Sequence, residues 1–317
     1  MKKAVLLYKR STNIGDDIQC IAALNLLGEK DTLILDRENL HENEESSDIK
    51  LLCNGWFMFN AENWPPAKNI HPYFISFHIA KYNRIRKLML AENLVPYYQQ
   101  FEPIGCRDHV TLNLFNKIGI KSYFSGCATL TMDKSRSKRS NDIIVTDPFI
   151  NDLLTEEYAR KVTFKLIPKE FHPQVKLKTH IRKNTDISIE EQLNEGKELL
   201  KEYAQAKLVI TSRIHCALPC LALGTPVYFV DFGYIRKINR DRFDGILDLM
   251  HTVRPILPFH ENRRIDKVLK FFNIHRLFFN TIKPLSINWE NPEPNPDDYK
   301  NIAADIKKRI AAEFKDL

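Results

Sequence analysis

The stretch KLVITSRIHCALPCLALGTPVYFVD, Lys207–Asp231, decides the fold. It opens with the apolar, largely β-branched run Leu208–Ile210, continues through a helix-compatible segment that ends at Gly224, and closes with the β-rich run Val227–Val230. This order predicts a strand, a short helix and a second strand. Two parallel strands joined by a helix form a βαβ unit, and open α/β sheets bind ligands at the carboxyl ends of their strands. A ligand site is therefore expected just after Thr211.

The start of the predicted helix is suited to an anion. Its first turn would present free backbone N–H groups, to which Ser212 adds a hydroxyl and Arg213 a planar guanidinium that matches phosphate or carboxylate. His215 follows on the same turn. The alternatives are that Arg213 is a solvated side chain and that His215 is structural. Cys216 and Cys220 could be drawn as metal ligands, but their apolar setting favours buried thiols, so no metal is predicted.

A second polar turn, NIGDD at Asn13–Asp17, also follows an apolar strand and precedes a helix, which Gly28 would end. Gly15 would let the backbone approach a ligand closely, and Asn13 or Asp16 could bond a sugar hydroxyl. The alternative is that Asp16 or Asp17 only caps the helix. The turn lacks the GxGxxG pattern, so no dinucleotide cofactor is predicted.

A third turn lies in IGCRDHVTLNLFNKIGI, Ile104–Ile120, which predicts a short strand, a polar pair and a helix. Asp108 suits the start of the helix, so its role could be structural. Arg107 would stand at the end of the strand and is the stronger candidate for a second contact with an anion.

Composition bounds the class of protein. The chain has 317 residues, 44% apolar and 27% charged, which is typical of a soluble protein with two domains. The net charge of +7 permits anionic ligands, but no zinc-knuckle spacing, RNP-like run or dense basic helix points to nucleic acid. No stretch approaches a membrane span, and the start of the chain lacks a signal-peptide cleavage site. The six scattered cysteines without a CxxC favour reduced thiols and a cytoplasmic protein.

The composition changes at MDKSRSKRSN, Met132–Asn141, which has no apolar periodicity and reads as a linker. Strand and helix signals flank it on both sides; in the second half they predict a strand at Asp142–Asp147, a helix around Leu153–Ala159 and another strand at Val162–Pro168. We therefore expect two Rossmann-like domains. The predicted bounds are residues 1–132 for the first domain, 133–141 for the linker, 142–255 for the second domain and 256–317 for a C-terminal helical extension.

The C-terminal extension contains RIDKVLKFFNIHRLFFNTI, Arg264–Ile282, which is apolar, aromatic and basic together. Packing against the protein is the expected role; the alternative is peripheral contact with the inner face of a membrane or with a partner. The last segment, Tyr299–Leu317, predicts an amphipathic helix that returns to the first domain.

Several segments together resemble the polysaccharide pyruvyl transferase family. TSRIHCALPCLALGTPV, Thr211–Val227, is similar to its C-terminal signature. NIGDD, CNGWF at Cys53–Phe57, and the pair GCRDHVT and SGCATLT between Gly105 and Thr131 match it in the right order. The resemblance covers residues 1 to about 235. It implies a GT-B-like α/β fold in which two Rossmann-like domains face a cleft, with the acceptor on the first domain and the donor on the second.

The resemblance implies that the donor is phosphoenolpyruvate and that a sugar receives a pyruvate ketal. The acceptor, a glycan or a lipid-linked sugar, and the oligomeric state remain open, and neither a redox cofactor nor a metal is required. Arg213, the adjacent helix start and Arg107 would hold the donor, and His215 would be the general acid. The resemblance places Asn54 in a turn that faces the interdomain cleft, and His180 matches a His that occurs in many relatives, so both are candidate substrate contacts. Possible bases are Asp16, Asp108 and His180.

Two other functions fit the same architecture. A GT-B glycosyltransferase would use a nucleotide sugar and also needs an anion-binding helix. A non-catalytic scaffold in glycan assembly would bind neither donor. The enzymatic interpretation requires that the imidazole of His215 is not sealed in the interior and that Arg213 faces the gap between the two halves.

Overall fold

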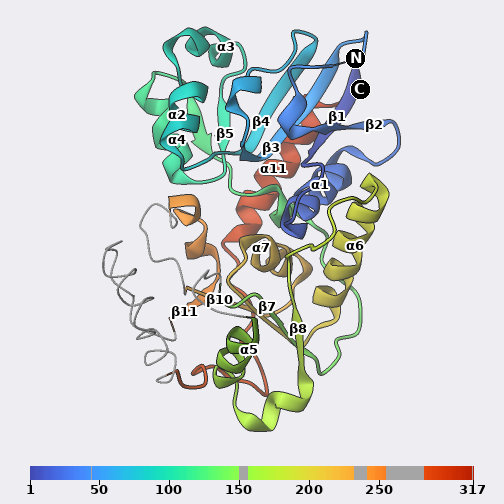
Figure 1. Cartoon of the computed structure of the whole chain (residues 1–317), viewed down its shortest axis with the longest axis vertical. Coiled ribbons are helices and arrows are strands. Elements are labelled where there is room, and N and C mark those ends of the chain that lie inside the picture. Colours follow the sequence, from blue (N-terminus) through green and yellow to red (C-terminus); the bar gives the residue numbers. More distant parts are fainter. Residues whose placement is uncertain (44, 150–155, 232–240, 255–281, 316) are drawn as a thin grey trace.

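The structure, a computed structural model, describes residues 1–43, 45–149, 156–231, 241–254, 282–315 and 317. Within them, two parallel sheets lie one above the other along the long axis of the molecule, with helices between and around them (Figure 1). The first sheet has the order β2-β1-β3-β4-β5-β6. Its strands are β1 (Lys2–Leu7), β2 (Thr32–Asp36), β3 (Ile49–Phe57), β4 (Ile70–Ile79), β5 (Ile104–Cys106) and β6 (Ser122–Phe124).

The second sheet has the order β11-β10-β9-β7-β8, and every strand pair in both sheets is parallel. In each sheet the first strand lies between the second and the third, so the connections leave it in opposite directions. This reversal is the topological switch point at which open α/β sheets bind their ligands. The strands of the second sheet are β7 (Ile143–Thr146), β8 (Val175–Lys178), β9 (Leu208–Thr211), β10 (Val227–Val230) and β11 (His251–Val253).

Capping residues set the ends of several helices. Asn13 caps the helix that Gly28 ends at a φ of 85°, and Ser188 forms a capping box with Glu191. Gly224 ends the helix of the second βαβ unit at a φ of 75°. The helices are α1 (Ile14–Leu27), α2 (Asn83–Met89), α3 (Val95–Gln99), α4 (His109–Lys117), α5 (Glu156–Lys165), α6 (Ile189–Gln205), α7 (Ile214–Leu223) and α11 (Tyr299–Glu313).

One prediction for the second half is wrong. The expected strand Val162–Pro168 begins inside α5, because Val162 and Leu166 are one helical turn apart and both enter the core beside β7. The predicted helix around Leu153–Ala159 falls partly outside the described residues, and its described part belongs to α5.

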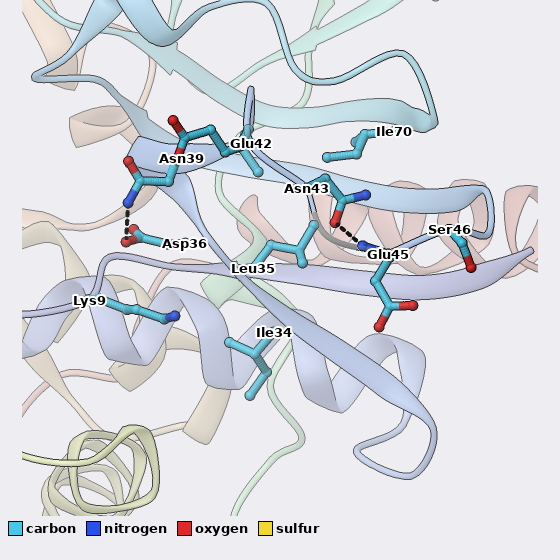
Figure 2. Close-up of a pocket in the computed structure, with 11 residues that line it drawn as sticks. Lys9, Ile34, Leu35, Asp36, Asn39, Glu42, Asn43, Glu45, Ser46 and Ile70 are labelled. Atoms are coloured by element: carbon cyan, nitrogen blue, oxygen red, sulfur yellow. Dashed lines mark hydrogen bonds between the residues drawn. The ribbon is translucent and has the colours of Figure 1, made fainter.

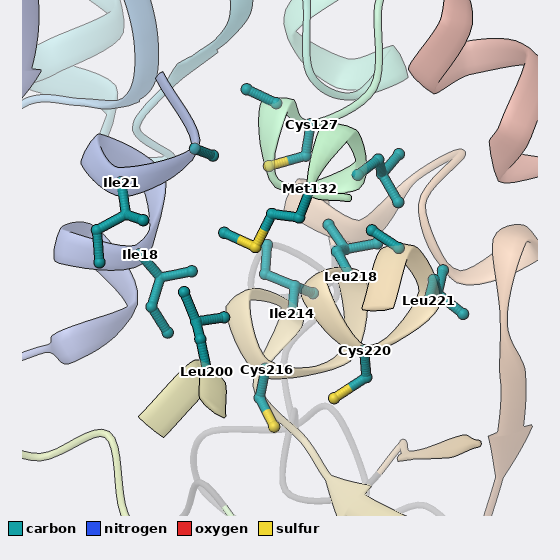
Figure 3. Packing of buried hydrophobic residues seen from close by; sticks show 14 of the residues in the cluster. Ile18, Ile21, Cys127, Met132, Leu200, Ile214, Cys216, Leu218, Cys220 and Leu221 are labelled. Carbon is teal, nitrogen blue, oxygen red and sulfur yellow. The ribbon is translucent and has the colours of Figure 1, made fainter. Parts of the chain in front are cut away.

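The core joins the two halves through three helices. α1 of the first half packs on α6 and α7 of the second. Figure 3 shows Ile18 and Ile21 of α1 facing Leu200 of α6 and Ile214 of α7 within one apolar cluster, which also includes Leu7 of β1. Burial of this continuous apolar surface fixes the starts of α1 and α7 relative to one another.

The chain returns to the first sheet at its end, as predicted. α11 runs upward between the halves and brings the C-terminus near the N-terminus (Figure 1). Lys50 of β3 forms an ion pair with Glu313, and the ring of Phe314 lies 6.2 Å from that of Tyr73. The apolar, basic segment from Arg264 onward lies outside the described residues, apart from its last residue.

The predicted linker is anchored to the second half. Arg139 donates from Nη1 to the carbonyls of Ala204 and Ala206 and to Oγ1 of Thr225, and from Nη2 to the carbonyl of Gly224. The segment lies between the last strand of the first sheet and the first strand of the second. The division of the chain into independent domains remains a prediction. None of the helices among the described residues combines the length and the apolar character that crossing a membrane requires.

Candidate functional site

At the switch point of the second sheet, the residues after β7 and β9 are tied together. Oδ2 of Asp147 accepts hydrogen bonds from Nε of Arg213 at 3.0 Å and from the backbone N–H of His180 at 2.8 Å. Its backbone carbonyl accepts from Oγ of Ser212 at 2.6 Å. The predicted residues Ser212, Arg213 and His180 therefore share one partner, Asp147, which holds the turn in shape.

The start of α7 is buried but has no side-chain cap. Its cap residue, Arg213, makes no side-chain hydrogen bond to the helix, whereas α1 and α4 are capped by Asn13 and Asp108. The side chain of Arg213 is 20% exposed, and its two terminal nitrogens have no hydrogen-bond partner among the described residues. Guanidinium nitrogens and helix N–H groups are both donors that bind phosphate or carboxylate.

His215 is the second residue of α7 and is 8% exposed. Its Nε2 is buried and finds no hydrogen-bond partner within the described part of the chain. Burial, followed by the positive charge of Arg107, lowers the pKa of His215 well below 6.5, so the imidazole is neutral in the free protein. Further groups that lower this pKa are His180, Arg242 and His78.

The start of α1 lies directly against His215. A β-carbon added at Gly15 would stand 3.1 Å from Cβ and 3.2 Å from Nδ1 of His215. The backbone N–H of Ile14 donates to the carbonyl of His180 at 2.8 Å, and Asn13 bridges to Ile181. Two helix starts, one from each half, thus converge on the imidazole, and their partial positive charges add.

Arg107 comes to this place from the end of β5 in the first sheet. It is 1% exposed, and its guanidinium makes no hydrogen bond to any described residue; Nε is 3.8 Å from Oδ2 of Asp108. Asp108 itself is engaged, since its carboxylate accepts from the backbone N–H of Thr111 at 2.9 Å and from Nδ1 of His78 at 2.5 Å. The structure thus leaves a buried, incompletely compensated charge beside His215.

The remaining predicted residues lie at the switch point of the first sheet. Asp16 accepts from Oγ of Ser11 at 2.7 Å and from Nε2 of Gln19 at 3.3 Å. Asn54 of β3 donates weakly to the carbonyl of Gln19 at 3.5 Å, and its Oδ1 is buried with no hydrogen-bond partner among the residues that the structure describes. Asp16 and Asn54 line a hollow of about 10 Å³ together with Leu6, Leu7, Tyr8, Gln19, Arg37 and Gly55.

A larger cavity of about 530 Å³ lies at the edge of the first sheet, beside β2 (Figure 2). Carboxylate and amide side chains surround it, but none of the predicted site residues does. It is lined by Lys9, Ile34, Leu35, Asp36, Asn39, Leu40, Glu42, Asn43, Glu45, Ser46 and Ile70.

Sequence reasoning missed three contributors. Asp147 is the last residue of a predicted strand, so the rule that found the other strand ends could have found it. Arg242 and Arg37 reach their places through long-range packing and carry no local signal. Among the residues that the structure describes, no group of three or more His, Cys, Asp or Glu side chains is placed to hold a metal ion.

Comparison with known proteins identifies the family. The family model for polysaccharide pyruvyl transferase matches residues 13–234, which confirms the resemblance carried by the four short motifs. No curated protein matches the chain. A solved structure of an uncharacterized protein from Klebsiella pneumoniae subsp. pneumoniae NTUH-K2044 is similar, with 14% identity, a TM-score of 0.45, and coverage of 77% of this chain and 88% of that one.

Proposed function

This chain belongs to the polysaccharide pyruvyl transferase family, and on that premise we propose that it transfers a pyruvyl group from phosphoenolpyruvate to a sugar. The product is a cyclic pyruvate ketal on a polysaccharide or its lipid-linked precursor, with release of phosphate. The donor carries a phosphate and a carboxylate, so its site must supply several positive contacts.

The observation that carries this proposal is the buried pair of unsatisfied groups, Arg107 and His215. Among the described residues, the buried guanidinium of Arg107 makes no hydrogen bond and Nε2 of His215 has no partner; such groups are costly unless a ligand or water supplies hydrogen bonds. A doubly acidic donor would supply hydrogen-bond partners for both groups. Arg107, the terminal nitrogens of Arg213 and the uncapped start of α7 would bind its two acidic groups.

The first chemical step is protonation of the methylene carbon, C3, which leaves an oxocarbenium-like centre at C2. His215 is neutral in the free protein, because its surroundings are apolar and positive. Binding of an anionic donor reverses the sign of the nearby charge and raises the pKa of His215, so that it takes up the proton it then delivers. Nε2 of His215 is buried in this structure, contrary to the accessible imidazole that the sequence interpretation requires, so a donor can reach it only after a local rearrangement.

The ketal then forms in two bond-making steps. A sugar hydroxyl attacks C2 and loses its proton to a base, and a second hydroxyl of the same sugar displaces phosphate from C2 and gives its proton to the departing phosphate. Of the three candidate bases, Asp108 is engaged by Thr111 and His78. Nε2 of His180 lies 3.0 Å from the hydroxyl of Tyr203. Asp16, whose side chain is 13% exposed, is the best placed to accept a proton.

The proposal is tested by phosphate release from phosphoenolpyruvate in the presence and absence of glycan or lipid-linked sugar. Release is expected only with an acceptor, and His215→Ala should abolish it without unfolding the protein. Undiminished release by that variant would remove His215 from the mechanism.

Donor binding is measured separately, as the rise in melting temperature on addition of phosphoenolpyruvate. Arg107→Gln should lose this rise. Arg84→Gln, which removes an arginine whose side chain is 71% exposed on α2, should keep it. Stabilisation by a nucleotide sugar instead of phosphoenolpyruvate would favour a glycosyltransferase.

We also place the protein in the cytoplasm, as sequence composition suggests. All six cysteines are buried and free, which suits a reducing compartment.

A further inference from the structure

The first sheet carries an aromatic platform beside the proposed donor site. The guanidinium carbon of Arg37 lies 4.4 Å from the ring centre of Tyr8, at the end of β1, and 5.3 Å from that of Trp56 in β3. Phe59 extends the platform, with its ring centre 5.4 Å from Tyr8 and 4.6 Å from Trp56. We use "platform" for these three rings and Arg37.

Phe59 is held in place although its ring faces solvent. Phe59 is 49% exposed. The carboxylate of Glu38 accepts from the backbone N–H of Phe59 at 3.0 Å and from that of Asn60 at 2.9 Å, and Glu38 also accepts from Nε of Arg37 at 3.1 Å. A large apolar ring that is both exposed and positioned in this way is a ready surface for a ligand with an apolar face.

The hollow of about 10 Å³ lies at the foot of the platform and is shared by Tyr8 and Arg37. Three polar atoms of its lining are buried without a partner among the described residues: Oε1 of Gln19, Oδ1 of Asn54 and Nη2 of Arg37. These residues are 4%, 4% and 3% exposed. The volume is close to that of one water-sized probe, which is the space that a single hydroxyl oxygen needs.

The unpartnered atoms determine which kind of chemical group the hollow can bind. Two are acceptors and one is a donor. A hydroxyl has one O–H and two lone pairs, so it can accept from Arg37 and donate to one of the two acceptors. An anionic group is disfavoured, because the acceptors and the carboxylate of Asp16 would repel it. The charge of Arg37 is already balanced by Glu38 at 3.1 Å and by Asp16 at 3.8 Å. A neutral sugar fits both the hollow and the platform, since its ring has hydroxyl groups and an apolar C–H face.

We propose that the hollow and the platform form the acceptor subsite, where a neutral hexose places one hydroxyl in the hollow and rests its ring on Phe59. This inference rests on the proposed function, since it assigns the acceptor of the same reaction. Its position supports it: the hollow lies between β1 and β3, at the switch point of the first sheet, and Asp16 lines it one residue after Gly15, which contacts His215. Asp16 would therefore face the attacking hydroxyl.

The test measures sugar binding without catalysis. Saturation-transfer NMR is recorded with methyl glucopyranoside, methyl mannopyranoside and methyl galactopyranoside on wild-type protein and on Phe59→Ala and Asn54→Ala. At least one sugar should bind to the wild type, and each variant should weaken binding at least about tenfold. Tyr82→Ala is the matched control, because Tyr82 is also an exposed aromatic residue (51%) but lies outside the platform.

The melting temperature and its rise with phosphoenolpyruvate are measured on the same samples. Both variants should keep that rise, which shows that they fold and retain the donor site. Sugar binding that is unchanged in both variants, or no binding of any of the three sugars to the wild type, overturns the subsite. Failure of phosphoenolpyruvate to stabilise the wild type would instead count against the proposed function, while variant-sensitive sugar binding would still support the subsite.

Discussion

The backbone of Gly15, in the first turn of α1, lies against the imidazole of His215, in the first turn of α7. A β-carbon at Gly15 would be 3.1 Å from Cβ of His215, which is tighter than ordinary van der Waals contact. The two residues come from different halves of the chain, and the shared core of α1, α6 and α7 holds them together. Any side chain at position 15 must therefore displace His215 or separate the two helix starts.

We expect Gly15→Ala to impair the reaction far more than the fold. In a helix, alanine in place of glycine gains about 1 kcal/mol of propensity, which offsets part of the cost of the close contact. A shift of His215 by a few tenths of an ångström, however, disturbs proton delivery. Acceptor-dependent phosphate release should fall by at least about tenfold, while the urea midpoint changes little.

Gly196→Ala is the control for simple crowding between helices. A β-carbon at Gly196 of α6 would be 2.7 Å from Cδ1 of Ile21, in the same helical layer but among apolar side chains. Its expected effect is on stability alone. Equal losses of activity in the two variants at equal stability would show that Gly15 has no special relationship with His215.

Donor binding should be accompanied by proton uptake. Burial and neighbouring positive charge lower the pKa of His215 well below 6.5 in the free protein, and an anionic donor raises it. Affinity for phosphoenolpyruvate should therefore decrease as the pH rises from 7.5 to 8.5, a range in which the phosphate of the donor is already fully ionised. Titration calorimetry in buffers of different ionisation enthalpy measures the uptake. His215→Gln should abolish it, and uptake that persists in this variant would assign the proton to another group.

The local parts of the site could be predicted from sequence, because each depends on a short pattern. Strand, polar turn and helix followed one another at Thr211–Ile214 and at Asn13–Asp17 as expected, and Gly28 and Gly224 end their helices. Asp108 caps α4 as its position before the helix suggested. The cap of α1 is Asn13 and not Asp16 or Asp17, so both carboxylates are left for other contacts.

What the sequence could not show depends on contacts between distant segments. Nothing near Arg37 indicates that it stacks on Tyr8 and Trp56, because the three meet only when β1 and β3 pair. The burial of His215 likewise results from α1 packing across it. The strand expected at Val162–Pro168 failed for a local reason: its β-branched and apolar residues suit a strand, but their spacing places them on one face of a helix.

The buried His78 should make a contribution to stability that is lost in mild acid, while the buried Asp17, whose pKa is raised to about 7, contributes in the opposite direction. Burial lowers the pKa of His78 to about 4, despite its contact with Asp108. A histidine with a lowered pKa stabilises the fold fully above its unfolded pKa of about 6.5 and loses that contribution as the pH falls toward 4, which for His78 amounts to ~3 kcal/mol. The difference between wild type and a variant without this histidine, in urea midpoints at pH 7.5 and 5, measures the loss.

His78→Gln keeps a donor for Asp108 but removes the titration, so its midpoint should depend less on pH over the same range. His71→Gln changes a histidine on the same strand whose side chain is 38% exposed, and it should retain the wild-type dependence. If His78→Gln is as sensitive to acid as the wild type, the instability arises elsewhere.

The two halves are joined by a buried ion pair that should be strongly coupled. Arg182 of the second half donates from Nη2 to Oδ2 of Asp17 in α1 at 2.5 Å and from Nη1 to the carbonyl of Ser11 at 2.9 Å. Arg182→Met leaves the Asp17 carboxylate buried without its partner, which costs about 3–5 kcal/mol of unfolding free energy. Asp17→Asn should cost less, and in the double variant the loss should be smaller than in Arg182→Met alone.

The pH dependence separates this coupling from a general loss of packing. Burial raises the pKa of Asp17 to about 7, even with Arg182 beside it. A carboxyl group with a raised pKa stabilises the fold below its unfolded pKa and loses that contribution as the pH rises through 7. Without Arg182 the charged form is still less favourable, so the deficit of Arg182→Met relative to wild type should grow between pH 6 and 8. Because an asparagine side chain does not titrate, the double variant should show no such growth. Losses that simply add, or a deficit that is constant with pH, would mean that Arg182 acts through its contacts with Ser11 and Glu195 and not through Asp17.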